Sequence, residues 1–145
     1  MTPAVAIVDT NVIVSGLLTT APNAPTALIL DAMLAGGFSY LLSVELLSEY
    51  RRVLRRPRIA RSHGLSDTDI DALLTGIALN GEVREAPKAG TAAPDAGDRH
   101  LWALLESDPA VMFVTGDEAL LKDATRPDRV VSPRQFVALL KQSRP

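Results

Sequence analysis

Four acidic residues occupy positions from which their carboxylates could hold a divalent cation. Asp9 directly follows the apolar run AVAIV, and Asp117 follows the run VMFVT after one glycine. Asp98 begins a helical pattern after a loop, and Glu49 flanks the apolar stripe of another helix. Converging carboxylates repel one another, and Mg²⁺ or Mn²⁺ relieves that repulsion because it takes oxygen ligands and keeps several waters. The pattern therefore favours a site for one or two metal ions.

Each acid also has a purely structural interpretation. Asp117 and Asp98 could cap the helices that follow them, and Asp9 could form an Asx turn after its strand. Glu49 could pair with a nearby arginine at the surface, an interaction of little worth. For any single residue the structural interpretation wins or ties. Four such residues would nevertheless have no reason to share one end of a sheet, so the joint pattern favours the metal site.

Two other carboxylate chemistries of α/β proteins fit this chain poorly. A phosphatase of the haloacid-dehalogenase type carries a second aspartate two residues after the first, where this chain has Asn11. A response-regulator receiver domain needs a late lysine after a strand, which the segment FVTGD does not supply. The chain has no cysteine, which excludes disulfides, thiolate zinc sites and cysteine nucleophiles.

The composition is that of an ordinary globular protein. The chain has 145 residues, of which 47% are hydrophobic and 22% charged, so we expect one domain over residues 1–145. It begins with no signal-peptide pattern and has no membrane-length apolar run, which predicts a cytoplasmic protein that does not contact a membrane. The net charge of −2 argues against broad nonspecific binding of nucleic acid.

Apolar periodicity predicts which elements hold these residues. Apolar runs predict strands over 4–8, 38–43, 111–115 and 130–131, with a possible edge strand over 82–85. Helical stripes lie over 25–34, 44–55, 67–79, 98–106, 118–123 and 133–141, and the Ala/Gly/Pro-rich residues 86–97 are expected to form a loop. A polar turn is expected after the first strand, and Pro57 should end or kink its helix. The alternation predicts an α/β fold with a mostly parallel sheet of four to five strands.

Four stretches, in this order, resemble the motifs of one family. They are VDTNVIVSGLL, SVELLSEYRRVL, PDAGDRHLWAL and FVTGDEALL. Together they are similar to PIN-domain proteins, and within that family to the bacterial VapC-like toxins. The resemblance covers residue 5 to about residue 140. It implies a three-layer α/β/α sandwich and a ribonuclease site that depends on magnesium or manganese.

Carried over residue by residue, the resemblance implies a set of catalytic acids that also bind the metal: Asp9, Glu49, Asp98 and Asp117. The polar residues that support such acids match Thr10, Asn11, Ser43 and Thr115. Relatives often carry adjacent acids before the third motif, whereas this chain has Asp95-Ala96-Gly97-Asp98. Asp95 is therefore the alternative third acid, and the helical phase of Leu101 and Leu104 favours Asp98. His63 and His100 are expected to be exposed or in loops rather than ligands.

Six arginines fall between positions 51 and 61, just after Glu49. The cluster could hold RNA phosphates at the rim of the site or meet an acidic segment of an antitoxin, whereas any single arginine is favoured to be solvated. The candidates for nucleic-acid binding are Arg52, Arg55, Arg56, Arg58 and, beside Asp98, Arg99. Aromatic residues make up only 4%, so base stacking should not dominate recognition, and Tyr50 and Trp102 are expected to pack in the core.

The function that the resemblance implies is a metal-dependent endoribonuclease, the toxin of a toxin–antitoxin pair. Its partners would be an RNA substrate, a small antitoxin protein and a second copy in a homodimer. Two alternatives stay open: an RNA-processing or DNA nuclease with no toxin role, and a catalytically silent module that binds RNA or a partner. The presence of all four acids speaks against the silent module.

Overall fold

The computed structural model describes residues 5–85, 99–106, 108–123 and 129–143. The strands are β1 (Val5–Val8), β2 (Ser39–Leu42), β3 (Glu82–Val83), β4 (Val111–Val114) and β5 (Val130–Val131). The helices are α1 (Thr10–Leu18), α2 (Pro25–Ala35), α3 (Val44–Leu54), α4 (Pro57–His63), α5 (Asp67–Asn80), α6 (Arg99–Glu106), α7 (Glu118–Lys122) and α8 (Pro133–Ser143).

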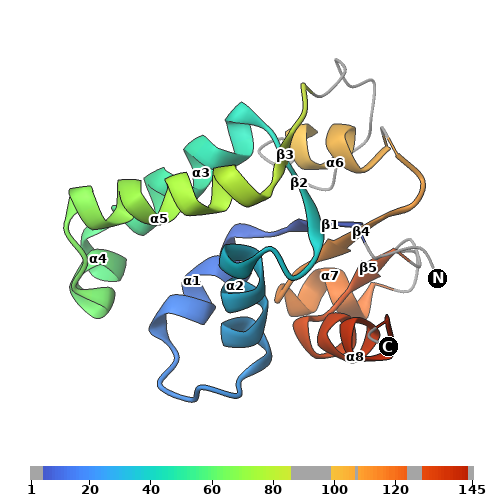
Figure 1. Ribbon diagram of the computed structural model, residues 1–145, viewed down its shortest axis with the longest axis horizontal. Coiled ribbons are helices and arrows are strands. Elements are labelled where there is room, and N and C mark those ends of the chain that lie inside the picture. Colours follow the sequence, from blue (N-terminus) through green and yellow to red (C-terminus); the bar gives the residue numbers. More distant parts are fainter. Residues whose placement is uncertain (1–4, 86–98, 107, 124–128, 144–145) are drawn as a thin grey trace.

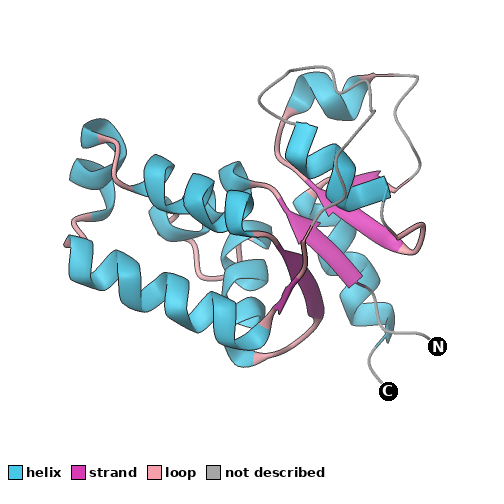
Figure 2. Cartoon of the chain, turned by 90° about the horizontal axis from the view of Figure 1, so that it is seen from above, coloured by secondary structure: helices cyan, strands magenta, loops and turns pink. Residues whose placement is uncertain are grey.

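The five strands form one parallel sheet in the order β3-β2-β1-β4-β5. Helix α6 lies on one side of β1 and β4, and α1, α2 and α8 lie on the other (Figure 1). Helices α3, α4 and α5 extend beyond the sheet as a helical arm (Figures 1 and 2). This architecture confirms the predicted α/β class, with the α/β/α layers of the sandwich. Within the described residues, no helix combines the length and apolar character needed to cross a lipid bilayer.

Strand β1 is the central strand of the sheet. Its register with β4 determines where the segments that follow these two strands leave the sheet. Val8 is opposite Val114, and the amide of Asp9 donates to the carbonyl of Val114 at 2.9 Å. Because the strands are parallel, the residues after β1 and those after β4 leave the sheet at the same edge. The segments that begin at Asp9 and Thr115 therefore start side by side.

Helix α1 stands where the sequence predicts a polar turn. Asp9 is extended and its carboxylate accepts from the amide of Thr10 at 2.8 Å, so the helix begins at once. Val12 and Ile13 are buried against the core. These β-branched residues have modest helix propensity, so the local pattern does not reveal a helix whose stability comes from packing. The turn prediction is therefore wrong.

Pro57 begins a helix of its own. Helix α3 ends at Leu54, and Pro57 occupies the first turn of α4, where the missing amide costs nothing. Nε2 of His63, at the end of α4, lies 2.8 Å from the carbonyl of Leu54, and its Nδ1 accepts from the amide of Leu65. His63 is thus a half-buried helix residue that joins α3 and α4, and the prediction of an exposed or loop position is wrong for it.

Both tyrosines of the chain are buried, and each donates its hydroxyl to the backbone. Tyr40 of β2 contacts the carbonyls of Met33 in α2, at 3.1 Å, and of Ile77 in α5, at 2.6 Å. Tyr50 of α3 donates to the carbonyl of Val8 at the end of β1, at 2.5 Å. The packing role predicted for Tyr50 is confirmed, and the hydroxyl adds a direct tie between the arm and the central strand.

Ionising these tyrosines should destabilise the fold. Burial raises the pKa of Tyr40 from 10.0 to about 12, and burial, followed by the charges of Asp9 and Glu49, raises the pKa of Tyr50 well above its ordinary value. The unfolded chain loses these protons at lower pH, so this stability is complete below about pH 10 and falls as pH rises. Urea denaturation should show a loss of about 1 kcal/mol per tyrosine between about pH 9 and about pH 11. Tyr40→Phe should remove about half of that pH-dependent loss, and an equal loss in the variant would contradict this account.

Two helical glycines should respond oppositely to alanine. A Cβ on Gly16 in α1 would lie 2.7 Å from the carbonyl oxygen of Thr26 in α2, whereas one on Gly76 in α5 would meet only a terminal methyl of Leu34, at 3.1 Å. Gly16→Ala should therefore separate two helices and cost about 1–3 kcal/mol. Gly76→Ala should be neutral or stabilise by up to about 1 kcal/mol, because alanine is the better helix former. Thermal denaturation of the two variants gives the comparison, and equal effects would refute the close approach of α1 and α2.

Candidate active site

Asp9 is fixed at the junction of β1 and α1 by hydrogen bonds to both of its carboxylate oxygens. Oδ1 accepts from the amide of Thr10 at 2.8 Å. Oδ2 accepts from the hydroxyl of Thr115 at 2.8 Å and from the side-chain amide of Asn11 at 3.1 Å. Asp9 therefore caps α1, where its structural interpretation expected an Asx turn, and it also lines a groove. The two roles coexist because a carboxylate has several acceptor sites.

Asn11 and Thr115 connect the ends of β1 and β4. Oδ1 of Asn11 accepts from the amide of Gly116 at 2.8 Å, while its Nδ2 donates to Asp9 and lies 3.3 Å from the hydroxyl oxygen of Thr115. The side chain of Thr115 is fully buried, and its oxygen also accepts from the amide of Asp117 at 3.1 Å. These two residues hold the loop after β4 against the start of α1.

Glu49 reaches the same place from α3. One of its oxygens accepts a hydrogen bond from the hydroxyl of Thr10, which is 6% exposed. The other lies 3.6 Å from Nε2 of His100 in α6. The His100 imidazole most strongly holds the pKa of Glu49 below its ordinary value; burial opposes this, and the Thr10 hydroxyl and the charge of Arg52 support it. Glu49 is thus held as a carboxylate.

The position of His100 differs from the exposed or loop position that the sequence predicts. It lies on α6 rather than in a loop, and its side chain is 20% exposed. Its Nδ1 is buried without a hydrogen-bond partner among the described residues. No pattern in the sequence predicts that His100 lies beside Glu49, because α6 and α3 are brought together only by the tertiary fold.

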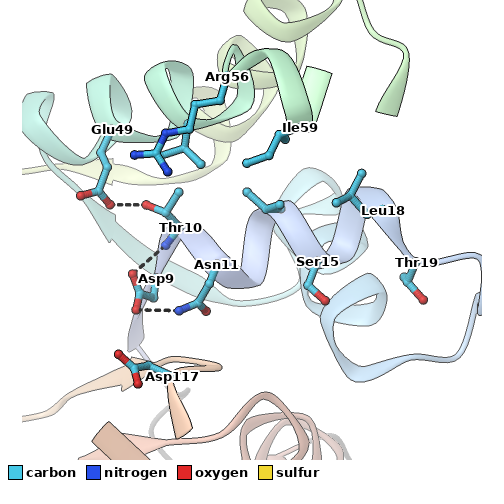
Figure 3. Close-up of a pocket in the computed structure, with 12 residues that line it drawn as sticks. Asp9, Thr10, Asn11, Ser15, Leu18, Thr19, Glu49, Arg56, Ile59 and Asp117 are labelled. Atoms are coloured by element: carbon cyan, nitrogen blue, oxygen red, sulfur yellow. Dashed lines mark hydrogen bonds between the residues drawn. The ribbon is translucent and has the colours of Figure 1, made fainter. Parts of the chain in front are cut away.

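Asp117 follows β4 and caps α7. Its Oδ1 accepts from the amides of Ala119 and Leu120, at 3.0 and 3.3 Å. The cap predicted as its structural alternative is therefore present. Its carboxylate is exposed and lies below that of Asp9 in Figure 3. As with Asp9, capping does not remove the carboxylate from the groove.

An open groove of about 730 Å³ collects three of the predicted acids (Figure 3). Asp9, Glu49 and Asp117 line one end, together with Thr10 and Asn11. The groove then continues along α1 toward α4. Apart from Arg56, its lining there consists of aliphatic and hydroxyl-bearing side chains: Val14, Ser15, Leu18, Thr19, Val53 and Ile59. Apart from Arg56, the residues of this second half carry no signal in the sequence, because they come from three helices and no motif connects them.

The third acidic motif is not placed. Asp95 and Asp98 lie outside the described residues, so the choice between them stays a prediction. Helix α6 begins at Arg99, directly after Asp98, and the side chain of Arg99 is likewise not described. Within the described residues, no group of three or more acids or histidines is close enough to hold a metal ion by itself.

Ser43 supports the site indirectly. It is fully buried and caps α3, accepting from the amide of Leu46 at 3.1 Å. It thereby fixes the first turn of the helix that carries Glu49 and Tyr50. Trp102 packs edge to face against Phe113 of β4, with ring centroids 5.6 Å apart, which confirms its predicted packing role.

The arginines after Glu49 divide into two sets. Arg51 and Arg55 form ion pairs with Asp71 and Asp67 of α5, at 2.9 and 3.1 Å. Each ion pair at an exposed surface contributes little to the free energy of unfolding. These two pairs nevertheless occupy both guanidinium groups on the α5 side of the arm. The predicted contact of Arg55 with nucleic acid stays a prediction.

The second set comprises Arg52, Arg56, Arg58 and Arg61, which are exposed and form no ion pair in the described part of the chain. Arg56 lines the groove, where its guanidinium points toward Thr10 and Glu49 (Figure 3). The surface ion pair with a nearby arginine that was the structural alternative for Glu49 is not formed among the described residues. These side chains are therefore available to an anionic ligand.

Comparison with known proteins agrees with this arrangement. A comparison with curated proteins found no match. A family profile of the PIN domain matches residues 5–119, which is most of the 145-residue chain and includes all four predicted acidic positions. Strands β1 to β4, the acids at the ends of β1 and β4 and the acid on α3 thus lie within the matched region. The chain belongs to the PIN-domain family, whose members are in general nucleases.

Proposed function

We propose that this protein is a divalent-metal-dependent endoribonuclease that hydrolyses RNA phosphodiester bonds, acting as the toxin of a toxin–antitoxin pair. The observation that carries the proposal is the convergence of Asp9, Glu49 and Asp117, from three separate elements, on one open groove. In the described residues only one basic side chain, Arg56, lines that groove. A net negative pocket at the edge of a parallel sheet is suited to a hard cation and then to a phosphate.

The residues fit magnesium or manganese by their chemistry. The carboxylates at this end of the groove offer oxygen atoms as metal ligands. Mg²⁺ is commonly held by one or two carboxylates, with waters and substrate phosphate completing its coordination shell. Asp9, Glu49 and Asp117 would hold one or two ions, with Asp98 proposed as the fourth acid. The ion would supply a nucleophilic water at neutral pH and stabilise the leaving oxygen.

The chain's own residues orient these acids. Asn11 and Thr115 fix the carboxylate of Asp9 from two sides, and the Thr10 hydroxyl fixes that of Glu49. The lowered pKa of Glu49 keeps it ionised and therefore able to act as a ligand. Such supporting contacts typically matter about 10- to 100-fold for metal affinity or activity.

The proposed reaction predicts cleavage of labelled single-stranded RNA in Mg²⁺ or Mn²⁺ and none in chelator. Asp9→Asn and Asp98→Asn should each lower the rate by at least about 100-fold, because each removes a proposed metal ligand. Asp31→Asn is the matched control, since Asp31 is exposed on α2 outside the groove. Cleavage of a circular RNA shows that the activity is endonucleolytic.

Several outcomes would change this proposal. Activity that survives chelation or both substitutions would refute the metal site. Preference for DNA of the same sequence would favour a DNA nuclease, and absence of cleavage with retained RNA binding would favour a silent binding module. The toxin role is tested by induced expression, which should arrest growth for the wild-type chain and not for Asp9→Asn, and by rescue with a small neighbouring antitoxin gene.

Thr115 should act as a positioning residue. Thr115→Val preserves the shape of a buried side chain but removes the hydroxyl that bonds Asp9, Asn11 and Asp117. We expect kcat to fall by about 10- to 100-fold with little change in KM, and the metal concentration for half-maximal activity to rise. Thr75→Val is the control, because that exposed hydroxyl bonds only its own helix, at the carbonyl of Asp71. A parallel loss of kcat and metal response in both variants would contradict the positioning role.

A further inference from the structure

We propose that the half of the groove between α1 and α4 binds an unpaired nucleotide of the substrate, with Arg56 on a phosphate and the base against Val14, Leu18 and Ile59. The inference rests on the proposed nuclease function, because it takes the carboxylate end of the groove as the cleavage end. It adds a requirement that the acids do not impose, namely that the bound RNA is single-stranded where it meets this half of the groove.

The groove is long enough to hold more than the reacting phosphate. It follows α1 from Thr10 to Thr19, about 14 Å at the helical rise per residue. The carboxylates occupy only its first turn. Beyond them, the wall changes from acidic to aliphatic, and Leu18 and Ile59 lie on the side of α1 away from the hydroxyls of Ser15 and Thr19 (Figure 3).

Arg56 supplies the positive charge at the boundary between these two halves. It is the one basic residue that lines the groove among the described residues, and it forms no ion pair there. The adjacent Arg55 is instead occupied by Asp67. A guanidinium beside an aliphatic wall matches a nucleotide, which presents a phosphate and an apolar base face within one unit.

The aliphatic wall selects for an unpaired base. Leu18 is 37% exposed, and Val14 and Ile59 are half-buried with their side chains on the groove. In a duplex the base faces are stacked and hidden, so only phosphates and groove edges could reach these side chains. An unstacked base can place its face against these aliphatic side chains.

The test measures binding rather than cleavage, so that its failure is distinguishable from failure of the proposed function. Fluorescence anisotropy with a labelled single-stranded RNA, in chelator, compares Arg56→Gln with Arg51→Gln. Losing one phosphate contact should lower the salt slope of binding by about 0.7 and the affinity about fivefold at roughly 0.1 M salt. Arg51→Gln should leave both unchanged, because Arg51 is paired with Asp71 of α5.

The aliphatic wall is tested with a second matched pair. Leu18→Ser should weaken binding about fivefold without changing the salt slope, because it removes apolar contact and no charge. Leu34→Ser is the control, since Leu34 is 39% exposed but lies on α2 outside the groove. Thermal denaturation shows whether each variant is folded, and an unlabelled RNA duplex should compete poorly with the labelled strand.

Four results would overturn the inference. They are equal effects of Arg56→Gln and Arg51→Gln, no effect of Leu18→Ser in a folded protein, equal competition by duplex, and displacement of the RNA by an acidic peptide at lower concentration than by unlabelled strand. The last would assign the groove to a protein partner. Metal-dependent cleavage that persists alongside any of them would leave the proposed function intact and remove only the nucleotide site.

Discussion

The parallel pairing of β1 with β4 is the constraint on which the rest of the site depends. Val8 opposite Val114, continued by the bond from the Asp9 amide to the Val114 carbonyl, brings two chain segments that are more than 100 residues apart to one edge of the sheet. Asp9 and Thr115 are then neighbours by necessity, and Asn11 and Asp117 lie within reach of them. A shift of one residue in this register would turn the side chains to the other face and disperse the network.

Capping and chemistry are carried by the same acids. Asp9 caps α1 and Asp117 caps α7, so each carboxylate is placed at the positive end of a helix. The cap fixes the side chain in one orientation, and both residues line the groove. Structural and functional interpretations of these residues are therefore not rivals in this fold. Hydrogen bonds from Thr10, Asn11 and Thr115 offset part of the cost of bringing charges together.

The helical arm completes the site from the other side. Tyr50 ties α3 to the end of β1, and Ser43 fixes the first turn of the same helix, so Glu49 cannot move independently of Asp9. The ion pairs of Arg51 and Arg55 attach α3 to α5 on the outer face. Arg56, at the start of α4, is thereby left to face the groove. One short stretch of sequence thus supplies both the fastening of the arm and the charge available to a ligand.

The sequence by itself determined the α/β class, the order of most strands and helices, and the acids at the ends of β1 and β4, because apolar periodicity and the position of a polar residue after a strand are local signals. It did not reveal α1 or α4. The β-branched residues of α1 and the proline at the start of α4 are weak local signals for helix, and packing stabilises both helices. Only the tertiary structure decided that His100 lies beside Glu49 and that three helices form one groove. It also decided that Arg55 pairs with Asp67 whereas the adjacent Arg56 lines the groove. These facts depend on how helices pack across the sheet edge, and no pattern along the chain encodes that geometry.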